Sequence, residues 1–449
     1  MNSAPSVKSA VTKIDVPVLA RVEGEGELHI KVKAGKILDL KLRIPEPPRL
    51  FEGFLRGRHL MEVPDITARI CGICPIAYQM SSVHALERAL GLTPHPFIRA
   101  LRRLFYCGEW IESHALHIFF LHLPDFLGCQ DAFEVAASHP DAVRMALRLK
   151  KLGNEIVRVM GGREIHPVSA CVGGFYRTPK PEELSALLPE LEWALDASLQ
   201  TVRLAASLEF PDFEQDYEFV ALSHPAEYAL NEGRIVSNRG LDIDAAAFEE
   251  HSVEQHVKHS NALHSVMRER GSYQVGPLAR FNLNFEQLTP QARRAAEEAG
   301  LRPPVRNPFR SIVARAVELV FACEEALQLI RSYEPPPAPR VEARPRAGTG
   351  MAATEAPRGL LYHRYSVDEN GLITAARIVP PTAQNFRRME EDLWNYVPSL
   401  LGLDNEQIAW RAEQAVRNYD PCISCATHFL KVRIDAVEPG GQDGAKPDR

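Results

Sequence analysis

The 449-residue sequence has little of several features that would assign it to a specialised class. It contains eight cysteines, too few for the disulfide framework of a small secreted domain. Lysine and arginine number 52 against 58 acidic residues, so the basic excess typical of a nucleic-acid-binding protein is missing. No run of about 18 uninterrupted apolar residues is present, which argues against a membrane-spanning helix.

The first twenty residues also lack targeting features. They contain neither an apolar core segment nor a twin-arginine pair. Hydrophobic residues make up 45% of the chain and charged residues 24%, which is ordinary for a globular protein with a large core. We therefore expect a cytoplasmic protein, in which cysteine thiols stay reduced and can bind metal ions.

The periodicity of apolar residues predicts a mostly helical α+β fold. Residues 16–44 alternate between apolar and polar and predict a β-hairpin, whereas helical periodicity dominates residues 63–156. Further helices are expected at 181–208 and 308–333, and residues 359–382 predict two strands joined by an Asn-Gly turn. The expected architecture is mostly α-helical, with small β-hairpins or sheets near both ends.

The same pattern indicates one large domain at residues 15–428. Residues 1–14 are a polar tail, and residues 334–350 are rich in proline and arginine, which predicts a loop within the domain. Residues 429–449 form a polar extension containing glycine and proline. No internal repeat divides the chain further.

Four of the eight cysteines form two C-x-x-C pairs, Cys71–Cys74 and Cys422–Cys425, near opposite ends of the chain. Two such pairs can make a four-thiolate site for zinc, nickel, copper(I) or iron. Structural zinc pairs are usually about 15–20 residues apart, yet the cysteines alone leave structural zinc and a catalytic metal equally open. The remaining cysteines stand singly and are expected in the core: Cys107, Cys129, Cys171 and Cys323.

The residues around the pairs resemble the large, catalytic subunit of nickel–iron hydrogenases. The flanking segments are Arg69-Ile70-Cys71-Gly72-Ile73-Cys74-Pro75 and Asp420-Pro421-Cys422-Ile423-Ser424-Cys425-Ala426-Thr427-His428. Further matching segments follow in the family's order: Arg21–Gly26, Phe51–Gly53, Glu112–His117, Gly161–Arg163 with His166–Pro167, Val275–Arg280, Glu355–Gly359 and Val379–Asn385. The resemblance implies a hydrogenase large-subunit-like fold and is strongest to the cytoplasmic, pyridine-nucleotide-linked (sulfhydrogenase-type) group.

The resemblance implies a nickel–iron centre held by the two cysteine pairs. Cys71, Cys74, Cys422 and Cys425 would ligate nickel, and Cys74 and Cys425 would also bridge to an iron atom carrying CO and cyanide. A terminal cysteine sulfur would be the first base in H2 cleavage. Cys422 or Cys71 is favoured for that role, with Cys425 next to the proton exit.

Further site residues are implied by the same matching segments. Glu23 would relay protons, and Arg358 would lie above the metals, where its guanidinium can donate to a cyanide nitrogen. Asp420 would orient Arg358. Pro381 and Thr382 match the segment that surrounds the second cyanide.

A second metal site is implied by Glu52 and His428. In the family, matching residues hold a magnesium or iron ion, and a carboxylate with an imidazole and waters fits magnesium. Ser113 departs from the best-known membrane-bound members, in which an aspartate helps to hold the active-site arginine. We expect the neighbouring His114 and His117 to be hydrogen-bonded core residues.

The resemblance implies reversible oxidation of H2 to protons and electrons within a larger complex. Because the chain has no G-x-G-x-x-G segment and no further cysteine clusters, electrons would leave through a small iron–sulfur subunit. Flavin- and NAD(P)-binding and iron–sulfur electron-transfer subunits would receive them. A maturation endopeptidase would cut after His428 and remove residues 429–449.

Other assignments stay open at this point. A hydrogenase linked to a deazaflavin or ferredoxin acceptor is the nearest one, followed by a hydrogen-sensing member of the family and a structural zinc protein. The homologous quinone-site subunit of respiratory complex I is disfavoured, because it lacks the cysteine pairs.

Overall fold

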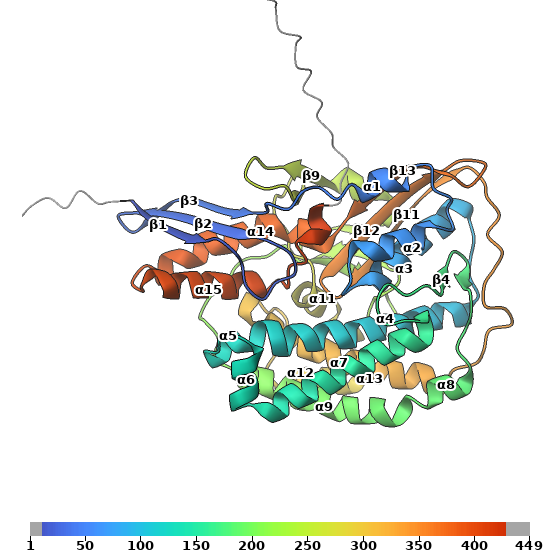
Figure 1. The fold of residues 1–449 in the computed structure, drawn as a ribbon, viewed down its shortest axis with the longest axis horizontal. Helices are drawn as coiled ribbons and strands as arrows, with labels where there is room; N and C mark the ends of the chain where they lie inside the picture. Colours follow the sequence, from blue (N-terminus) through green and yellow to red (C-terminus); the bar gives the residue numbers. More distant parts are fainter. Residues whose placement is uncertain (1–10, 428–449) are drawn as a thin grey trace, which may run out of the picture.

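The computed structural model describes residues 11–427 and has a helix-rich α+β architecture, which confirms the predicted fold class. Figure 1 shows long helices on one side of the molecule and small sheets on the other. The strands of every described sheet run antiparallel. Within residues 11–427, no helix is both long and apolar enough to cross a membrane.

Long helices pack around α4 in the helical part. α4 packs against α7 and α13, and α13 in turn packs against α9 and α12. The bounds of these helices are α4 (Pro96–Leu116), α7 (Pro140–Gly161), α9 (Leu188–Ala206), α12 (Pro290–Glu298) and α13 (Ser311–Arg331). The apolar run that starts at His114 continues α4 through a π-helical turn at His117–His122 and is largely buried.

Two glycines allow α4 and α7 to approach closely. A Cβ atom on Gly153 of α7 would lie 2.6 Å from the backbone nitrogen of Glu112 and 2.7 Å from the carbonyl oxygen of Gly108 on α4. Real Cβ contacts are not this short, so the crossing requires glycine.

Shorter helices connect these elements and carry several site residues. Their bounds are α1 (Phe51–Leu55), α2 (Val63–Thr67), α3 (Pro75–Leu90), α5 (Leu123–Leu127), α6 (Ala132–Ser138), α8 (Pro181–Ser185), α10 (Phe248–His251) and α11 (Pro277–Asn284). The helices predicted at 181–208 and 308–333 correspond to α8 with α9, and to α13 with the short 3-10 turn before it.

The N-terminal sheet has the order β1–β2–β3, with β1 (Thr12–Val16), β2 (Glu27–Lys33) and β3 (Lys36–Arg43). The β2–β3 pair is the predicted hairpin. The boundary placed after residue 14 was wrong for residues 12–14, which begin β1 because Ile14 is buried against β2. α14 (Pro381–Tyr396) and α15 (Asn405–Arg417) pack against this sheet.

A second three-stranded sheet lies over α3. It consists of β11 (Gly348–Ala356), β12 (Gly359–Val367) and β13 (Ile373–Val379), and the predicted turn at Asn370–Gly371 joins its last two strands. β11 was not predicted, and it takes residues 348–350 from the expected loop. A Cβ atom on Gly350 would lie 2.0 Å from the carbonyl oxygen of Ala85, so glycine permits this strand to contact α3.

Three small sheets in the middle of the chain were also not predicted. They pair β4 (Ala170–Cys171) with β5 (Gly174–Phe175), β6 (Val220–Ser223) with β7 (Arg234–Ser237) and β8 (Asp242–Ile243), and β9 (Ser252–His256) with β10 (Leu263–Met267). Sheets are therefore not confined to the two ends of the chain, as had been expected. The sequence did not reveal these sheets because strands this short leave no clear alternation of apolar and polar residues.

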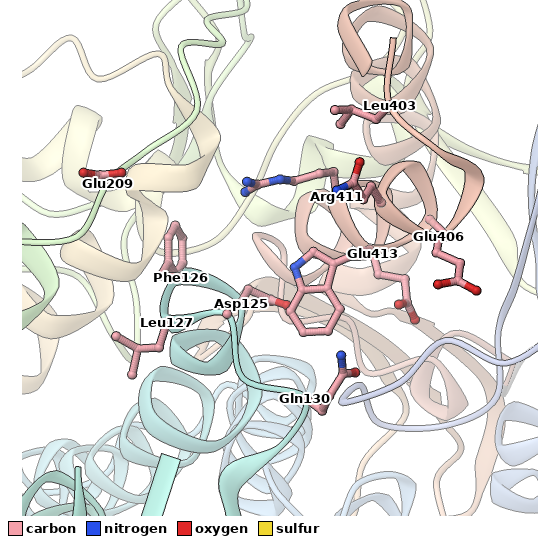
Figure 2. Close-up of a pocket in the computed structure, with 13 residues that line it drawn as sticks. Asp125, Phe126, Leu127, Gln130, Glu209, Leu403, Glu406, Arg411 and Glu413 are labelled. Atoms are coloured by element: carbon pink, nitrogen blue, oxygen red, sulfur yellow. The ribbon is translucent and has the colours of Figure 1, made fainter. Parts of the chain in front are cut away.

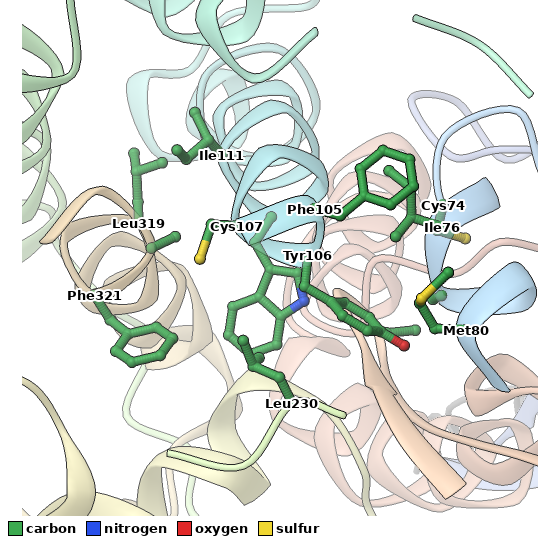
Figure 3. Packing of buried hydrophobic residues seen from close by; sticks show 14 of the residues in the cluster. Cys74, Ile76, Met80, Phe105, Tyr106, Cys107, Ile111, Leu230, Leu319 and Phe321 are labelled. Atoms are coloured by element: carbon green, nitrogen blue, oxygen red, sulfur yellow. The ribbon is translucent and has the colours of Figure 1, made fainter. Parts of the chain in front are cut away.

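Figure 3 shows the main core where α4 meets α13 and α3. Cys107 lies there among apolar side chains, and Cys171 and Cys323 are likewise buried, as expected. Cys129 is only partly buried, and it packs against the edge of this core. Cys74 lies at the edge of this core with Ile76 and Met80, which places the first cysteine pair in an apolar environment.

Candidate metal centre

The two C-x-x-C pairs come together in one buried cluster. The sulfur of Cys71 lies 2.8 Å from that of Cys74 and 3.6 Å from that of Cys422. The sulfurs of Cys71, Cys422 and Cys425 all lie within 4.8 Å of one another. All four side chains are buried as free thiols. Since a tetrahedral Zn–thiolate site has sulfurs about 2.3 Å from the metal, these separations are of the size of a single metal centre.

Backbone geometry at both pairs directs the sulfurs inward. Cys74 is the residue before α3, and the buried carboxylate of Glu109 accepts hydrogen bonds from Ile76 N at 2.7 Å and Ala77 N at 3.2 Å. These contacts hold the first turn of α3 and therefore the exit of the first cysteine loop. Asp420, just before the second pair, has a φ of 51°, which turns the chain sharply into Cys422.

The four cysteines could ionise together only beside a cation. Burial raises the pKa of both Cys422 and Cys425. Burial also opposes ionisation of Cys71, but hydrogen bonds from the neighbouring thiols outweigh it and lower the pKa of that thiol. Four buried thiolates cannot coexist without positive charge close to them. The donor set is soft, so it fits nickel, iron, zinc or copper(I) better than magnesium or calcium.

Glu23 lies beside the second pair. The Cys422 thiol donates to its Oε2 at 3.0 Å, and Ser424 N donates to the same oxygen at 3.2 Å. The backbone of Glu23 also forms a parallel β-bridge with Cys422. Both the backbone and the carboxylate of Glu23 are therefore bound to the segment that carries the second cysteine pair. This arrangement provides a path for a proton between a cluster sulfur and a partly exposed carboxylate.

Arg358 lies against the first pair and is almost fully buried. Its Nε donates to the backbone oxygen of Asp420 at 2.7 Å, its Nη2 to Asp420 Oδ1 at 3.0 Å, and its Nη1 to Cys74 Sγ at 3.9 Å. Burial disfavours the charge, but Asp420 and the cysteine sulfurs outweigh burial and raise the pKa of Arg358. The guanidinium therefore stays charged over the cluster.

Ser113 forms no hydrogen bond with the Arg358–Asp420 ion pair. Its buried hydroxyl oxygen has no hydrogen-bond partner among residues 11–427, and Asp420 supplies the carboxylate that Arg358 binds. His114 Nε2 pairs with Glu318 Oε2 at 3.0 Å, and His117 Nε2 with the carbonyl oxygen of Arg417 at 2.8 Å. Both histidines are hydrogen-bonded core residues, as predicted.

The start of α14 contacts the second cysteine pair. Pro381 is the first residue of this helix, and Thr382 Oγ1 accepts a hydrogen bond from Cys422 N at 3.0 Å. The oxygen acts as acceptor here, which leaves the hydroxyl hydrogen to be donated to another group.

Glu52 lies in α1. Its buried Oε1 accepts a hydrogen bond from Ile378 N of β13 at 2.9 Å. Arg49 N donates to the carbonyl oxygen of Thr427 at 2.6 Å, which brings the last described residue to the segment that carries Glu52. His428, the other predicted ligand of this site, lies outside the described residues.

The sequence alone did not assign roles to three residues that build this centre. Arg49 Nη1 donates to the carbonyl oxygens of Ile70 at 2.8 Å and Ser424 at 3.3 Å, so it joins the two cysteine loops. Arg280 donates to the carbonyl oxygens of Ala356 and Pro357, directly before Arg358. The sequence could have pointed to Arg280, because it lies in the segment Val275–Arg280 that resembles the family. No sequence motif pointed to Arg49 or to Glu109.

Figure 2 shows a separate surface cavity of about 860 Å³, bordered by α5 and α15. Asp125 lines this cavity and binds Arg21 and Arg417 at 2.5 and 2.7 Å. None of the four cysteines lines this cavity, so the cysteine cluster is not part of it.

Comparisons with known proteins agree with this centre. The family profile described as nickel-dependent hydrogenase matches residues 49–144 and 265–428. The alpha subunit of sulfhydrogenase 1 from Pyrococcus furiosus is 34% identical over 430 residues, covering 95% of this chain and 100% of that protein. The beta subunit of the NAD-reducing hydrogenase HoxS from Cupriavidus necator is 28% identical, covering 93% and 95%.

Solved structures show the same fold. An NAD+-reducing [NiFe]-hydrogenase in the H2-reduced state superposes with a TM-score of 0.85 at 27% identity, covering 94% of this chain and all of that one. The [NiFeSe]-hydrogenase of Dm. baculatum gives a TM-score of 0.76 at 22% identity, covering 93% and 100%. The chain belongs to the nickel-dependent hydrogenase family, as a large subunit of the nickel–iron type.

Proposed function

We propose that this chain is the catalytic subunit of a cytoplasmic nickel–iron hydrogenase that converts H2 reversibly into two protons and two electrons. The observation that carries the proposal is the convergence of four buried cysteines on Arg358 and Glu23. The donor set fits a nickel–iron pair with CO and cyanide on iron, held by Cys71, Cys74, Cys422 and Cys425. When bound, this group supplies the heterolytic cleavage of H2.

The residues of the chain handle the proton. Cys422 Sγ accepts it first and passes it to Glu23 Oε2, 3.0 Å away. The Ser424 N–H, at 3.2 Å, keeps the carboxylate oriented during this transfer. Cys71 is the alternative first base, because its sulfur lies 3.6 Å from that of Cys422. The sulfur of Cys425 belongs to the same cluster, next to this exit.

Arg358 and α14 would enclose the iron side of the group. Arg358 is held charged by Asp420 and can donate to a cyanide nitrogen. Pro381 and Thr382 would surround the second cyanide, to which the Thr382 hydroxyl can donate. These residues would therefore bind the ligands of the iron rather than the iron itself.

Glu52 and His428 would hold a Mg2+ or Fe2+ ion near the C-terminus of the mature domain. The buried carboxylate of Glu52 fits a hard cation, and the backbone nitrogen of Arg49 donates to the carbonyl oxygen of Thr427, the residue before His428 in the sequence. The chain up to residue 428 would be the working form after a maturation endopeptidase has cut between His428 and Phe429. Intact mass of the active enzyme tests this: residues 429–449 still present in fully active protein would refute it.

Electrons would pass first to a small iron–sulfur subunit, then to flavin- and NAD(P)-binding subunits. The NAD-reducing and sulfhydrogenase relatives support this acceptor. A deazaflavin or ferredoxin acceptor is the second candidate. The proteins that co-purify with the chain, and the rate of NAD(P) reduction with H2, distinguish the two.

Metal analysis combined with infrared spectroscopy tests the proposed function most directly. For the purified complex we expect one nickel per chain, iron in excess of nickel because the partner subunits carry iron–sulfur clusters, and infrared bands of bound CO and cyanide. Zinc in the cysteine cluster without such bands would refute a hydrogenase. The bands together with negligible turnover would instead indicate a hydrogen sensor.

A further inference from the structure

Two histidines and a glutamate converge at a second place, apart from the cysteines. His259 lies in the loop between β9 and β10, His264 lies in β10, and Glu390 lies in α14. One ligand atom from each lies within 4.8 Å of the others. His259 Nε2 is 2.7 Å from Glu390 Oε1, and His264 Nδ1 is 3.9 Å from Glu390 Oε2.

His264 is buried without a hydrogen bond. Only 1% of its side chain is exposed, and its ring stacks on Phe386 of α14 with centroids 5.6 Å apart. Neither ring nitrogen has a hydrogen-bond partner among the residues that the structure describes. Burial, with smaller contributions from His259 and Arg387, lowers the pKa of His264 to about 3, so the ring is neutral and has a lone pair to offer.

Glu390 is fixed by the backbone of the N-terminal sheet. Its Oε1 accepts a hydrogen bond from Leu42 N of β3 at 3.0 Å as well as facing His259. Its Oε2 is the oxygen nearest to His264. Anchoring one carboxylate oxygen in this way orients the other, as outer hydrogen bonds commonly do for metal ligands.

These three donors match a known preference of transition metals. Two imidazole nitrogens with one carboxylate oxygen are a frequent zinc ligand set, in which bond lengths are about 2.0–2.2 Å. Ligand atoms of one ion then lie no more than about 4.2 Å apart, so small side-chain movements would close the set. The His259 side chain is 20% exposed, which leaves an opening for the ion and for a water as fourth ligand.

We propose that His259, His264 and Glu390 bind one divalent transition-metal ion of the zinc type. The ion would join the β9–β10 hairpin to α14, whose Glu390 is also bound by the backbone of β3. Because α14 also carries Thr382, which contacts Cys422, the ion would fix the helix that borders the cysteine centre. The site shares no ligand with the nickel–iron centre or with the Glu52–His428 site. The proposal of this third site can therefore be wrong while the other two are right, and the reverse.

The test uses the purified hydrogenase complex with its nickel–iron centre filled. Zinc content and the zinc K-edge absorption spectrum are measured after the complex is incubated with ZnCl2 and desalted. We expect one zinc per chain, with nitrogen and oxygen ligands that include imidazole. The His259→Ala variant, at a partly exposed position, should bind zinc at least about 100-fold more weakly, since even outer-shell changes cost 10–100-fold.

His29→Ala is the matched control. His29 also contacts two carboxylates, Asp15 at 2.7 Å and Glu27 at 3.1 Å, but it lies on the surface without a second histidine in contact. Its variant should keep the zinc. His264→Gln provides a second test of the ligand set and should also lose it.

Three results would overturn the proposal. They are a wild-type complex that takes up no zinc, a zinc spectrum with sulfur ligands, and equal zinc binding in His259→Ala and wild type. A polar cluster bridged by water predicts the first result. Should His264→Gln fail to fold, the comparison of His259→Ala with wild type decides, because the His259 side chain is partly exposed.

Discussion

Replacing Glu23 by glutamine tests whether the carboxylate beside Cys422 carries the proton. Glutamine has nearly the same shape, and its amide oxygen can still accept the Ser424 N–H that now lies at 3.2 Å. It cannot take up a proton from the Cys422 thiol, 3.0 Å away. Positioned proton transfer contributes about 10²–10⁴-fold to rates, so we expect H2 oxidation to fall by at least about 100-fold.

The assay combines turnover with spectroscopy. H2-dependent dye reduction measures the rate, and infrared bands of CO and cyanide show whether the centre is intact. Glu25→Gln is the matched control, because Glu25 lies in the same segment and is exposed; its rate should stay within about twofold of wild type. A Glu23→Gln enzyme with intact bands and more than a tenth of the wild-type rate would show that protons leave by another route.

Three further predictions concern the framework of the site. Asp420→Asn leaves the buried Arg358 without its carboxylate and should lower the free energy of unfolding, measured in urea, by about 3 kcal/mol. As a control, Asp216→Asn breaks an exposed pair with Arg239 and should cost less than about 1 kcal/mol. Gly153→Ala should cost about 1–3 kcal/mol in the same measurement because its Cβ atom would meet α4, and Gly402→Ala, with open space around it, should cost nothing; equal effects would contradict the close packing. Burial lowers the pKa of His114 to about 4. As the pH falls from about 6.5 to 4, His114 therefore binds a proton in the unfolded chain but not in the folded one. The free energy of unfolding should fall by about 3 kcal/mol over that range because of this group. His114→Gln should flatten the pH dependence of the unfolding temperature there, and an unchanged slope would contradict the assignment.

Local sequence patterns predicted the elements whose signals are strong. The long amphipathic helices and the β2–β3 hairpin follow from apolar periodicity and from a two-residue turn with positive φ at Ala34 and Gly35. The short strands between residues 170 and 267 were missed, because strands of two to five residues do not establish a period. β11 was missed because its glycines, which allow contact with α3, resemble loop residues.

The two cysteine pairs could be recognised from sequence because each is a local motif with distinctive flanks. Their meeting at 3.6 Å, and the contacts of Glu23 and Arg358 with them, depend on the fold. Arg49 and Glu109 hold the two loops through backbone atoms, and backbone contacts leave no mark on residue identity.

What the sequence by itself determined was the chemistry available: reduced thiols in pairs, a helix-rich fold, and segments typical of hydrogenase large subunits. What only the tertiary structure decided was which distant groups face one another. Asp420 rather than residue 113 pairs with Arg358, and Glu390 meets two histidines more than a hundred positions earlier in the chain. The reason is physical: a side chain's pairing and charge depend on burial and on neighbours from other elements, and neither is encoded in its local sequence.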